Sequence, residues 1–259
     1  MTGTSANIYQ TLAWHARRRP AKPAILDRRR AFTFAELVGL VRSLALSLDA
    51  AGVERGDRIA VLADNCIETI ALLHATALTG FILVPVNTRY SAEELRYVLD
   101  DSQPRLVVHA PEYGSLLAQA LEGGASVSPL GLDLAALAKS GDGCDLSWRD
   151  RLGFETWSYG SVDGDDVAML IYTSGTTSRP KGAMLTHGNL IWNSINYIME
   201  SELRSTHSAI LATPLFHISG FGVMHGPLLH AGGALYVVDR FSPERIIEAL
   251  QAFKPSPLF

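Results

Sequence analysis

A run of small and hydroxylated residues in the second half of the chain has the composition of a phosphate-binding loop. Residues 172–182 read Tyr-Thr-Ser-Gly-Thr-Thr-Ser-Arg-Pro-Lys-Gly and directly follow an apolar segment. Small residues let successive backbone N–H groups approach phosphate oxygens, while hydroxyl groups add donors and a lysine adds positive charge. The candidate phosphate-binding residues are therefore Thr173, Ser174, Gly175, Thr176, Thr177 and Lys181.

This loop differs from the Walker-type P-loop, which needs Gly-Lys followed by Ser or Thr. Here Pro180 precedes Lys181 and Gly182 follows it. Pro180 also opposes immediate helix formation after the loop. A phosphoryl-transferring ATPase is therefore disfavoured. The alternative that composition alone leaves open is a surface loop that is rich in Ser and Thr and has no binding role.

The segment 205–238 contains four histidines and no Asp, Glu, Lys or Arg. Single histidines in an apolar segment are more often buried and hydrogen-bonded than functional. The sequence has no metal-ligand spacing such as HExxH. The residues alone therefore favour a structural reading of all four, which are His207, His217, His225 and His230.

The elements that must position these residues alternate between helix-like and strand-like patterns. Apolar residues at helical spacing predict helices at residues 34–51, 67–78, 91–101, 113–121, 187–199, 222–230 and 243–252. Short apolar runs predict strands at residues 58–63, 81–86, 106–109, 167–172, 209–213 and 234–238, with a polar loop between residues 172 and 187. This alternation favours mostly parallel sheets flanked by helices, so the predicted fold class is α/β.

Local signals place the starts of two helices. Ser91, followed three residues later by Glu94, matches the capping-box pattern. Ser242 can cap a helix that carries Pro243 in its first turn.

An uncharged stretch at residues 69–88 approaches the length of a membrane span. Gly80 divides it into a helix-like half and a strand-like half, and His74 and Pro85 suit lipid poorly. A buried helix followed by a buried strand explains the stretch, so no transmembrane segment is predicted.

Gly, Asp and Ser become frequent between residues 141 and 166, where periodicity is weak. This composition predicts a boundary near Gly160. Residues 1–160 would form a first α/β subdomain. Residues 161–259 would begin a second α/β subdomain, which carries the phosphate loop and is truncated.

Bulk properties fit a globular protein. The chain has 259 residues, of which 47% are hydrophobic and 19% charged. A net charge of -4 gives no electrostatic reason to expect nucleic acid as a partner. The N-terminus lacks the apolar segment of a secretory signal, so a cytoplasmic location is expected. Cys66 and Cys144 have no CxxC or Cys/His spacing and predict neither a disulfide nor a metal site.

Residues 173–182 resemble the signature loop of the adenylate-forming, or AMP-binding, superfamily. This superfamily includes acyl-CoA synthetases, aryl-CoA ligases, luciferases and the adenylation domains of nonribosomal peptide synthetases. Ser178 stands where the family pattern has glycine. Further segments that resemble family landmarks, in the family's order, are residues 32–37, 52–58, 85–90 and 214–220.

The resemblance implies part of the large N-terminal domain of the adenylate-forming ligase fold. In related enzymes the signature loop wraps the ATP phosphates, so Lys181 is the implied catalytic cation and Thr173 an implied Mg²⁺ ligand. An aromatic residue and a histidine lie beside the acyl pocket and correspond to Phe216 and His217, the latter also an implied catalytic residue. Phe221 corresponds to a gate to the tunnel of long-chain members.

The implied reaction starts when a carboxylate attacks the α-phosphorus of ATP, which releases magnesium pyrophosphate and leaves an acyl adenylate. A thiol, expected to be coenzyme A, then takes the acyl group. Both partners of the first step are anionic, so Mg²⁺, Lys181 and the loop donors must offset their repulsion. The implied partners are a small-molecule carboxylic acid, with a fatty acid favoured, and coenzyme A; a homodimer is left open.

Several family features have no counterpart in the chain. These are the Tyr-Gly-x-Thr-Glu segment, the ribose-binding Asp, the hinge and the catalytic Lys of the C-terminal domain. The isolated chain is therefore expected to give little or no complete turnover. Two alternatives stay open: an inactive truncated remnant or interaction module, and an enzyme that adenylates amino acids or aryl acids for a carrier protein.

Overall fold

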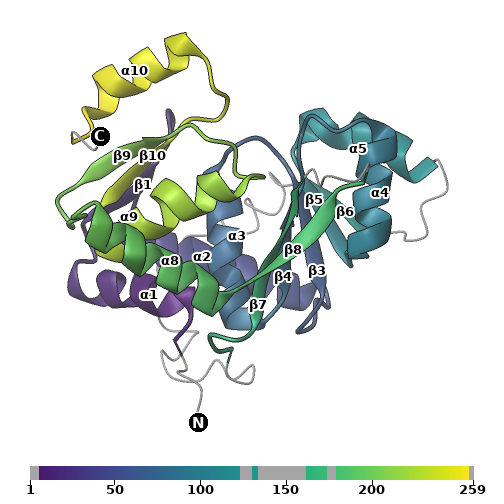
Figure 1. Ribbon diagram of the computed structural model, residues 1–259, viewed down its shortest axis with the longest axis horizontal. Coiled ribbons are helices and arrows are strands. Elements are labelled where there is room, and N and C mark those ends of the chain that lie inside the picture. The colour runs from purple at the N-terminus through teal and green to yellow at the C-terminus, as the bar shows by residue number, and fades with distance from the viewer. Residues whose placement is uncertain (1–5, 123–129, 134–161, 174–178, 257–259) are drawn as a thin grey trace.

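The computed structural model describes residues 6–122, 130–133, 162–173 and 179–256. These ranges form two β-sheets flanked by helices, which confirms the predicted α/β class (Figure 1). One sheet has the strand order β2-β1-β10-β9 and the other the order β6-β5-β3-β4-β7-β8. The strands of the four-stranded sheet are β1 (Pro23–Leu26), β2 (Ala31–Thr33), β9 (Ser208–Leu211) and β10 (Ala234–Val237). Those of the six-stranded sheet are β3 (Arg58–Leu62), β4 (Ile82–Pro85), β5 (Leu106–His109), β6 (Leu130–Asp133), β7 (Val167–Thr173) and β8 (Lys181–Thr186).

Most neighbouring strands in the described ranges run parallel, as predicted. In the centre of the six-stranded sheet, Ala60 of β3 lies opposite Val84 of β4 and Val107 of β5. The antiparallel pairs are β1 with β2 and β7 with β8. The second of these pairs is the hairpin that carries the candidate phosphate loop.

The helices lie between the two sheets and on the outer face of each sheet (Figure 1). The middle layer contains α1 (Ile8–Arg18), α2 (Phe34–Ala50), α3 (Ile67–Thr79), α8 (His187–Glu200) and α9 (Gly226–Ala231). The short 3₁₀ helix η1 (Pro111–Tyr113) leads into α5 (Gly114–Glu122), which covers the outer face of the six-stranded sheet together with α4 (Ala92–Ser102). Helix α10 (Pro243–Phe253) covers the outer face of the four-stranded sheet.

The largest group of buried side chains lies in this middle layer and joins the two sheets. It includes Ile25 of β1 and Val61 of β3, packed with Phe34 of α2. Strand β3 shows how one strand serves two cores, because successive side chains point to opposite faces. Val61 packs into the central group, whereas Ala60 and Leu62 pack against α4 and α5.

The predicted caps are confirmed. Ser91 accepts a hydrogen bond from the backbone N–H of Glu94, whose side chain accepts one from the N–H of Ser91. Ser242 caps α10 by accepting from the N–H of Arg245. Gly80 ends α3 in the left-handed region at φ 74°, a conformation that favours glycine.

Several segments differ from the sequence-based prediction. Residues 181–186 were expected to belong to a polar loop but form β8, because they pair with β7. The helix expected at residues 222–230 is instead a π-helical turn, η2 (Gly220–His225), followed by α9. The elements α1, β1, β2 and β6 were not predicted.

The proposed boundary at residue 160 stays a prediction, because residues 134–161 lie outside the described ranges. Each sheet nevertheless combines strands from both sides of that position. Strands β1 and β2 share a sheet with β9 and β10, and β7 and β8 share one with β3 and β4.

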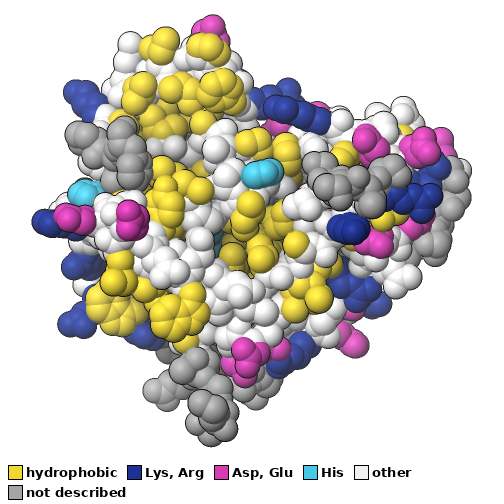
Figure 2. Space-filling view, in the orientation of Figure 1, with side chains coloured by type: hydrophobic (Ala, Val, Ile, Leu, Met, Phe, Trp, Pro, Cys, Tyr) yellow, Lys and Arg dark blue, Asp and Glu magenta, His cyan; other side chains and the backbone are white. Residues whose placement is uncertain are grey.

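Helix α10 leaves part of its apolar surface open. Figure 2 shows hydrophobic side chains gathered over this helix. They include Ile247, 55% exposed, and Leu250, 46% exposed. Among the described helices, none is long and apolar enough to cross a membrane.

Candidate functional site

The β7–β8 hairpin brings two of the candidate phosphate-binding residues together. Thr173, the last residue of β7, lies opposite Lys181, the first residue of β8, and both are exposed. The loop between them contains the candidates Ser174, Gly175, Thr176 and Thr177, which lie outside the described residues. The hairpin therefore presents a hydroxyl and an ammonium group at the two ends of this loop.

Helix α4 holds both arms of the hairpin near the loop. The Tyr172 hydroxyl donates to Asp101 Oδ2 at 2.6 Å, and the Tyr97 hydroxyl donates to the carbonyl of Pro180 at 3.2 Å. The guanidinium of Arg179 lies over the ring of Tyr97, 5.4 Å from the ring centre. One helix thus fixes the residues that enter and leave the loop.

Gly182 makes this arrangement possible by lying opposite Tyr172 in the hairpin. A Cβ atom at position 182 would lie 3.1 Å from Cζ of the tyrosine ring, so the missing side chain gives the ring room to lie across β8. Burial raises the pKa of Tyr172, and the hydrogen bond to Asp101 raises it further. The hydroxyl therefore stays protonated and keeps donating to Asp101 at neutral pH.

The second group of candidates lies after β9. Leu215 is buried, Phe216 is half-buried and His217 is exposed. A short turn holds this segment, in which the N–H of His217 donates to the carbonyl of Pro214 at 3.1 Å and the N–H of Gly220 donates to the carbonyl of His217 at 2.9 Å. The turn directs the imidazole of His217 toward solvent.

Ser219 orients this imidazole. Its backbone N–H donates to Nδ1 of His217 at 3.3 Å, and its Oγ lies 2.9 Å from the same nitrogen. Nδ1 is therefore an acceptor, so a neutral His217 carries its proton on Nε2. The exposed ring edge can then donate a hydrogen bond to an acid or an acyl adenylate.

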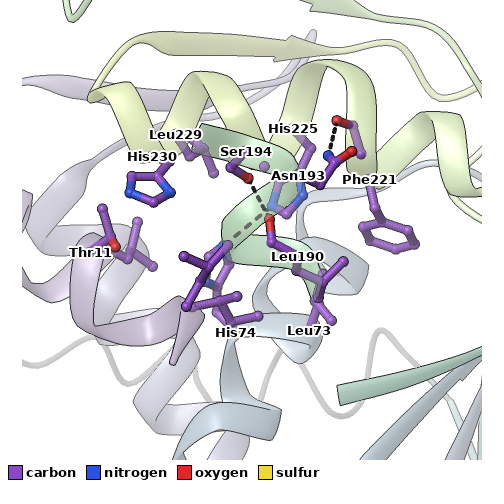
Figure 3. Close-up of a pocket in the computed structure, with 15 residues that line it drawn as sticks. Thr11, Leu73, His74, Leu190, Asn193, Ser194, Phe221, His225, Leu229 and His230 are labelled. Carbon is purple, nitrogen blue, oxygen red and sulfur yellow. Dashed lines mark hydrogen bonds between the residues drawn. The ribbon is translucent and has the colours of Figure 1, made fainter. Parts of the chain in front are cut away.

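Phe221 lies deeper, on η2, and is only 1% exposed. It lines a cavity of about 30 Å³ together with residues of α1, α3 and α8 (Figure 3). Its ring meets that of His225 edge-on at 5.7 Å. Phe221 thus follows the segment of His217 in the sequence and lines an internal cavity, and its role as a gate stays a prediction.

Two buried histidines meet at this cavity. Nε2 of His74 and Nε2 of His225 lie 3.3 Å apart, and Figure 3 shows the two rings facing each other between α3 and η2. Burial lowers the pKa of His74 to about 4 and that of His225 well below its ordinary value. Both rings are therefore neutral at pH 7, and one proton between them makes the hydrogen bond. His225 is thus buried and hydrogen-bonded, as expected of a histidine in an apolar segment.

The two groups of candidates belong to different sheets. Lys181 lies on the edge strand of the six-stranded sheet, whereas His217 follows β9 of the four-stranded sheet. Sequence reasoning missed the residues that hold each group in place, which are Tyr97 and Asp101 for the loop and Ser219 for the histidine.

The described residues of the hairpin offer a metal ion one neutral side-chain ligand, so an Mg²⁺ ion there would need phosphate oxygens to complete its shell. The described residues contain no cluster of three or more His, Cys, Asp or Glu side chains that could hold a metal. Thr173 offers a single neutral oxygen at the end of β7. Mg²⁺ commonly binds through few protein ligands and completes its shell with phosphate oxygens and water.

The chain resembles one family of known proteins along nearly its whole length. The family model of AMP-binding enzymes matches residues 12–259. The chain belongs to the AMP-binding enzyme family. A feruloyl-CoA synthase from Amycolatopsis sp is 37% identical over 245 residues, which cover 94% of this chain and 46% of that relative. The chain thus spans about half the length of the curated relatives it matches.

Solved structures of this family share the fold. A putative long-chain-fatty-acid CoA ligase from Rhodopseudomonas palustris CGA009 has a TM-score of 0.80 and 28% identity, and the match covers 96% of this chain and 61% of that one. ATP-bound MatB from Rhodopseudomonas palustris has a TM-score of 0.74 and 29% identity, with 95% and 48% of the two chains covered. Two of these similar proteins are named as a CoA synthase and a CoA ligase.

Proposed function

We propose that the full-length gene product is an ATP-dependent ligase that joins a carboxylic acid to coenzyme A through an acyl adenylate. The observation that carries this proposal is the β7–β8 hairpin, in which Thr173 and Lys181 lie opposite each other at the ends of the family's phosphate loop. The match to AMP-binding enzymes over residues 12–259 supports it.

In this proposal the loop and Lys181 bind the phosphates of ATP. Residues Ser174, Gly175, Thr176 and Thr177 contribute backbone N–H and hydroxyl donors, and the Thr173 hydroxyl helps to hold Mg²⁺. Attack of a carboxylate on a phosphate brings two anions together, so fixed donors and positive charge at the phosphates lower the barrier. Bound Mg²⁺ would supply further charge neutralisation.

Phe216 and His217 form the proposed acid side of the site. Phe216 is half-buried beside His217, whose Nε2–H is free to donate toward solvent because Ser219 occupies Nδ1. A donor in this position can hold the acid's carboxylate or the carbonyl oxygen of the acyl adenylate. Neither role needs a protein nucleophile.

The acid itself is assigned by class only. The fatty acid expected from the sequence stays a prediction. The name of the feruloyl-CoA synthase, which is 37% identical, favours an aromatic acid as the alternative. Coenzyme A as acceptor follows from the names of the relatives, whereas the cytoplasmic location and the homodimer stay predictions.

The test is acid-dependent exchange of radiolabelled pyrophosphate into ATP by the full-length gene product, followed by mass spectrometry of the thioester. Ferulate, palmitate and a set of amino acids are compared. The proposal expects exchange with at least one acid, release of AMP, and an acyl-CoA product. Release of ADP would contradict the acyl-adenylate reaction, and the absence of exchange with every acid would favour the inactive remnant. An acyl thioester found only on a carrier protein would favour the adenylation alternative.

A further inference from the structure

Asn65 makes an unusual set of contacts between the two sheets. It lies between β3 and α3 and is 7% exposed. Its side-chain Nδ2 donates to the carbonyl of Thr213 at 3.0 Å and to the carbonyl of Val238 at 3.1 Å. Its Oδ1 accepts from the backbone N–H of Leu215 at 2.8 Å. One buried amide therefore satisfies three backbone groups.

These three groups belong to the other sheet. Thr213 and Leu215 follow β9, and Val238 follows β10. The backbone N–H of Asn65 adds a fourth bond to the carbonyl of Asp239 at 3.2 Å. Asn65, just after the carboxyl end of β3, thus holds the segments that follow β9 and β10. In α/β proteins, ligands commonly bind beside the carboxyl ends of the strands.

The contacts on both sides of Pro214 explain why an amide is needed. Pro214 has no N–H of its own, and its neighbours present a carbonyl at 213 and an N–H at 215. An asparagine side chain offers a donor and an acceptor side by side, which matches this pair. The carbonyl of Pro214 then accepts from the N–H of His217, so the next bond along the chain holds the histidine turn.

We propose that Asn65 is the positioning residue for the segment of Phe216 and His217. Its hydrogen bonds hold residues 213 and 215, which connect β9 to that segment. They thereby set the position of the His217 imidazole relative to the bound acid. This inference rests on the proposed function, in which His217 contacts the acid. Asn65 itself touches no reactant in this scheme.

A replacement at Asn65 should therefore affect acid binding more than ATP binding. Asn65→Ala removes all three side-chain hydrogen bonds and leaves their backbone partners at Thr213, Leu215 and Val238 without them. Asn65→Asp keeps an acceptor for Leu215 but places carboxylate oxygens against the carbonyls of Thr213 and Val238. Both variants should raise the KM for the acid by about tenfold or more, while the KM for ATP changes by less than about twofold.

Asn7 provides a matched control. It is also a buried asparagine, at 8% exposed, and its Nδ2 also donates to two carbonyls, those of Ala77 and Val162. Asn7→Ala therefore removes a similar amide clamp that does not contact residues 213–215. It should lower the melting temperature in the same way as Asn65→Ala but leave the KM for the acid unchanged.

Amide hydrogen exchange tests the positioning independently of activity. In the full-length gene product, Asn65→Ala should speed exchange at Leu215 and His217, whereas Asn7→Ala should not. Unchanged exchange at these two amides in a folded Asn65→Ala variant overturns the proposal, whatever the enzyme assay gives. Faster exchange without acid-dependent activity in the wild type would keep the positioning role and reject the proposed function instead. An equal increase in the KM for the acid in Asn65→Ala and Asn7→Ala would also overturn the positioning proposal.

Discussion

Tyr172 and Asp101 are joined by a 2.6 Å hydrogen bond between the last turn of α4 and the strand that leads into the phosphate loop. Together with the bond from Tyr97 to the carbonyl of Pro180, it ties α4 to both arms of the hairpin. The loop that is expected to bind ATP phosphates is therefore held at its base by a helix from another part of the chain. Preorganised donors of this kind need less rearrangement when the charge of the ligand arrives.

Removing this anchor should weaken nucleotide binding. Tyr172→Phe keeps the ring over Gly182 but deletes the hydroxyl that donates to Asp101. We expect the KM for ATP to rise roughly three- to tenfold, the equivalent of one lost hydrogen bond, with little change in the KM for the acid. Tyr236→Phe on β10 of the other sheet is the matched control. An unchanged KM for ATP in Tyr172→Phe would contradict the anchoring role.

The histidine segment should affect the acid instead. His217→Ala removes the exposed Nε2–H, and the KM for the acid should rise by roughly three- to tenfold while the KM for ATP stays the same. Ser219→Ala deletes Oγ but keeps the backbone N–H that donates to Nδ1. Its effect should therefore be smaller than that of His217→Ala. Steady-state kinetics with each substrate varied in turn measure the difference, and the reverse order would count against the tautomer assigned here.

Stability should fall in mild acid because of buried neutral histidines. Burial lowers the pKa of His187 to about 4, whereas an unfolded histidine titrates near 6.5. Between these values the unfolded chain binds the proton more readily than the folded protein does. The free energy of unfolding is therefore greatest above pH 6.5 and decreases as the pH falls toward 4.

His187→Leu isolates this contribution. Urea unfolding of wild type and variant should differ by a constant amount above pH 6.5. As the pH is lowered toward 4, the variant should gain stability relative to wild type, because it has no ring to protonate on unfolding. If the difference in the free energy of unfolding between wild type and His187→Leu stays constant from pH 6.5 to pH 4, protonation of His187 does not affect stability.

Alanine substitutions at two glycines with positive φ distinguish the cost of backbone strain from the cost of crowding by neighbouring atoms. Gly232 has φ +81°, and a Cβ there would lie 2.4 Å from Cε1 of His15. Gly56 has φ +84°, with no atom within 4 Å of such a Cβ. Gly56→Ala should cost about 1–2 kcal/mol from the left-handed conformation alone. Gly232→Ala should lower the melting temperature further, and equal losses in the two variants would contradict the packing against His15.

The sequence was informative where burial determines structure. Apolar spacing and caps such as Ser91 placed most helices and strands, because those elements bury one or both faces. Strand β8 was missed because its side chains are largely exposed, with Met184 at 68%, and pairing with β7 rather than burial holds it. Strand β2 was missed because it has only three residues and none of them is buried.

The resemblance to the AMP-binding family identified the candidate site residues. The residues that hold them in place could be identified only from the structure. Asn65 contacts Thr213 across 148 positions of sequence, and no local pattern marks such a pair. The same holds for Tyr172 and Asp101, 71 positions apart. The π-helical turn at Phe221 was predicted as ordinary helix because its composition carries no signal for the wider hydrogen-bond spacing.

The most direct test of the central claim is acid-dependent ATP–pyrophosphate exchange in the full-length gene product carrying Lys181→Ala. Arg204→Ala is the control, since it removes one positive charge from a side chain that is 72% exposed and lies in the turn between α8 and β9. If the hairpin binds the ATP phosphates, Lys181→Ala should reduce exchange by at least about tenfold, as expected for a lost charged contact, and Arg204→Ala should leave it unchanged. Exchange at the wild-type rate in Lys181→Ala would contradict the assignment of this loop as the phosphate site.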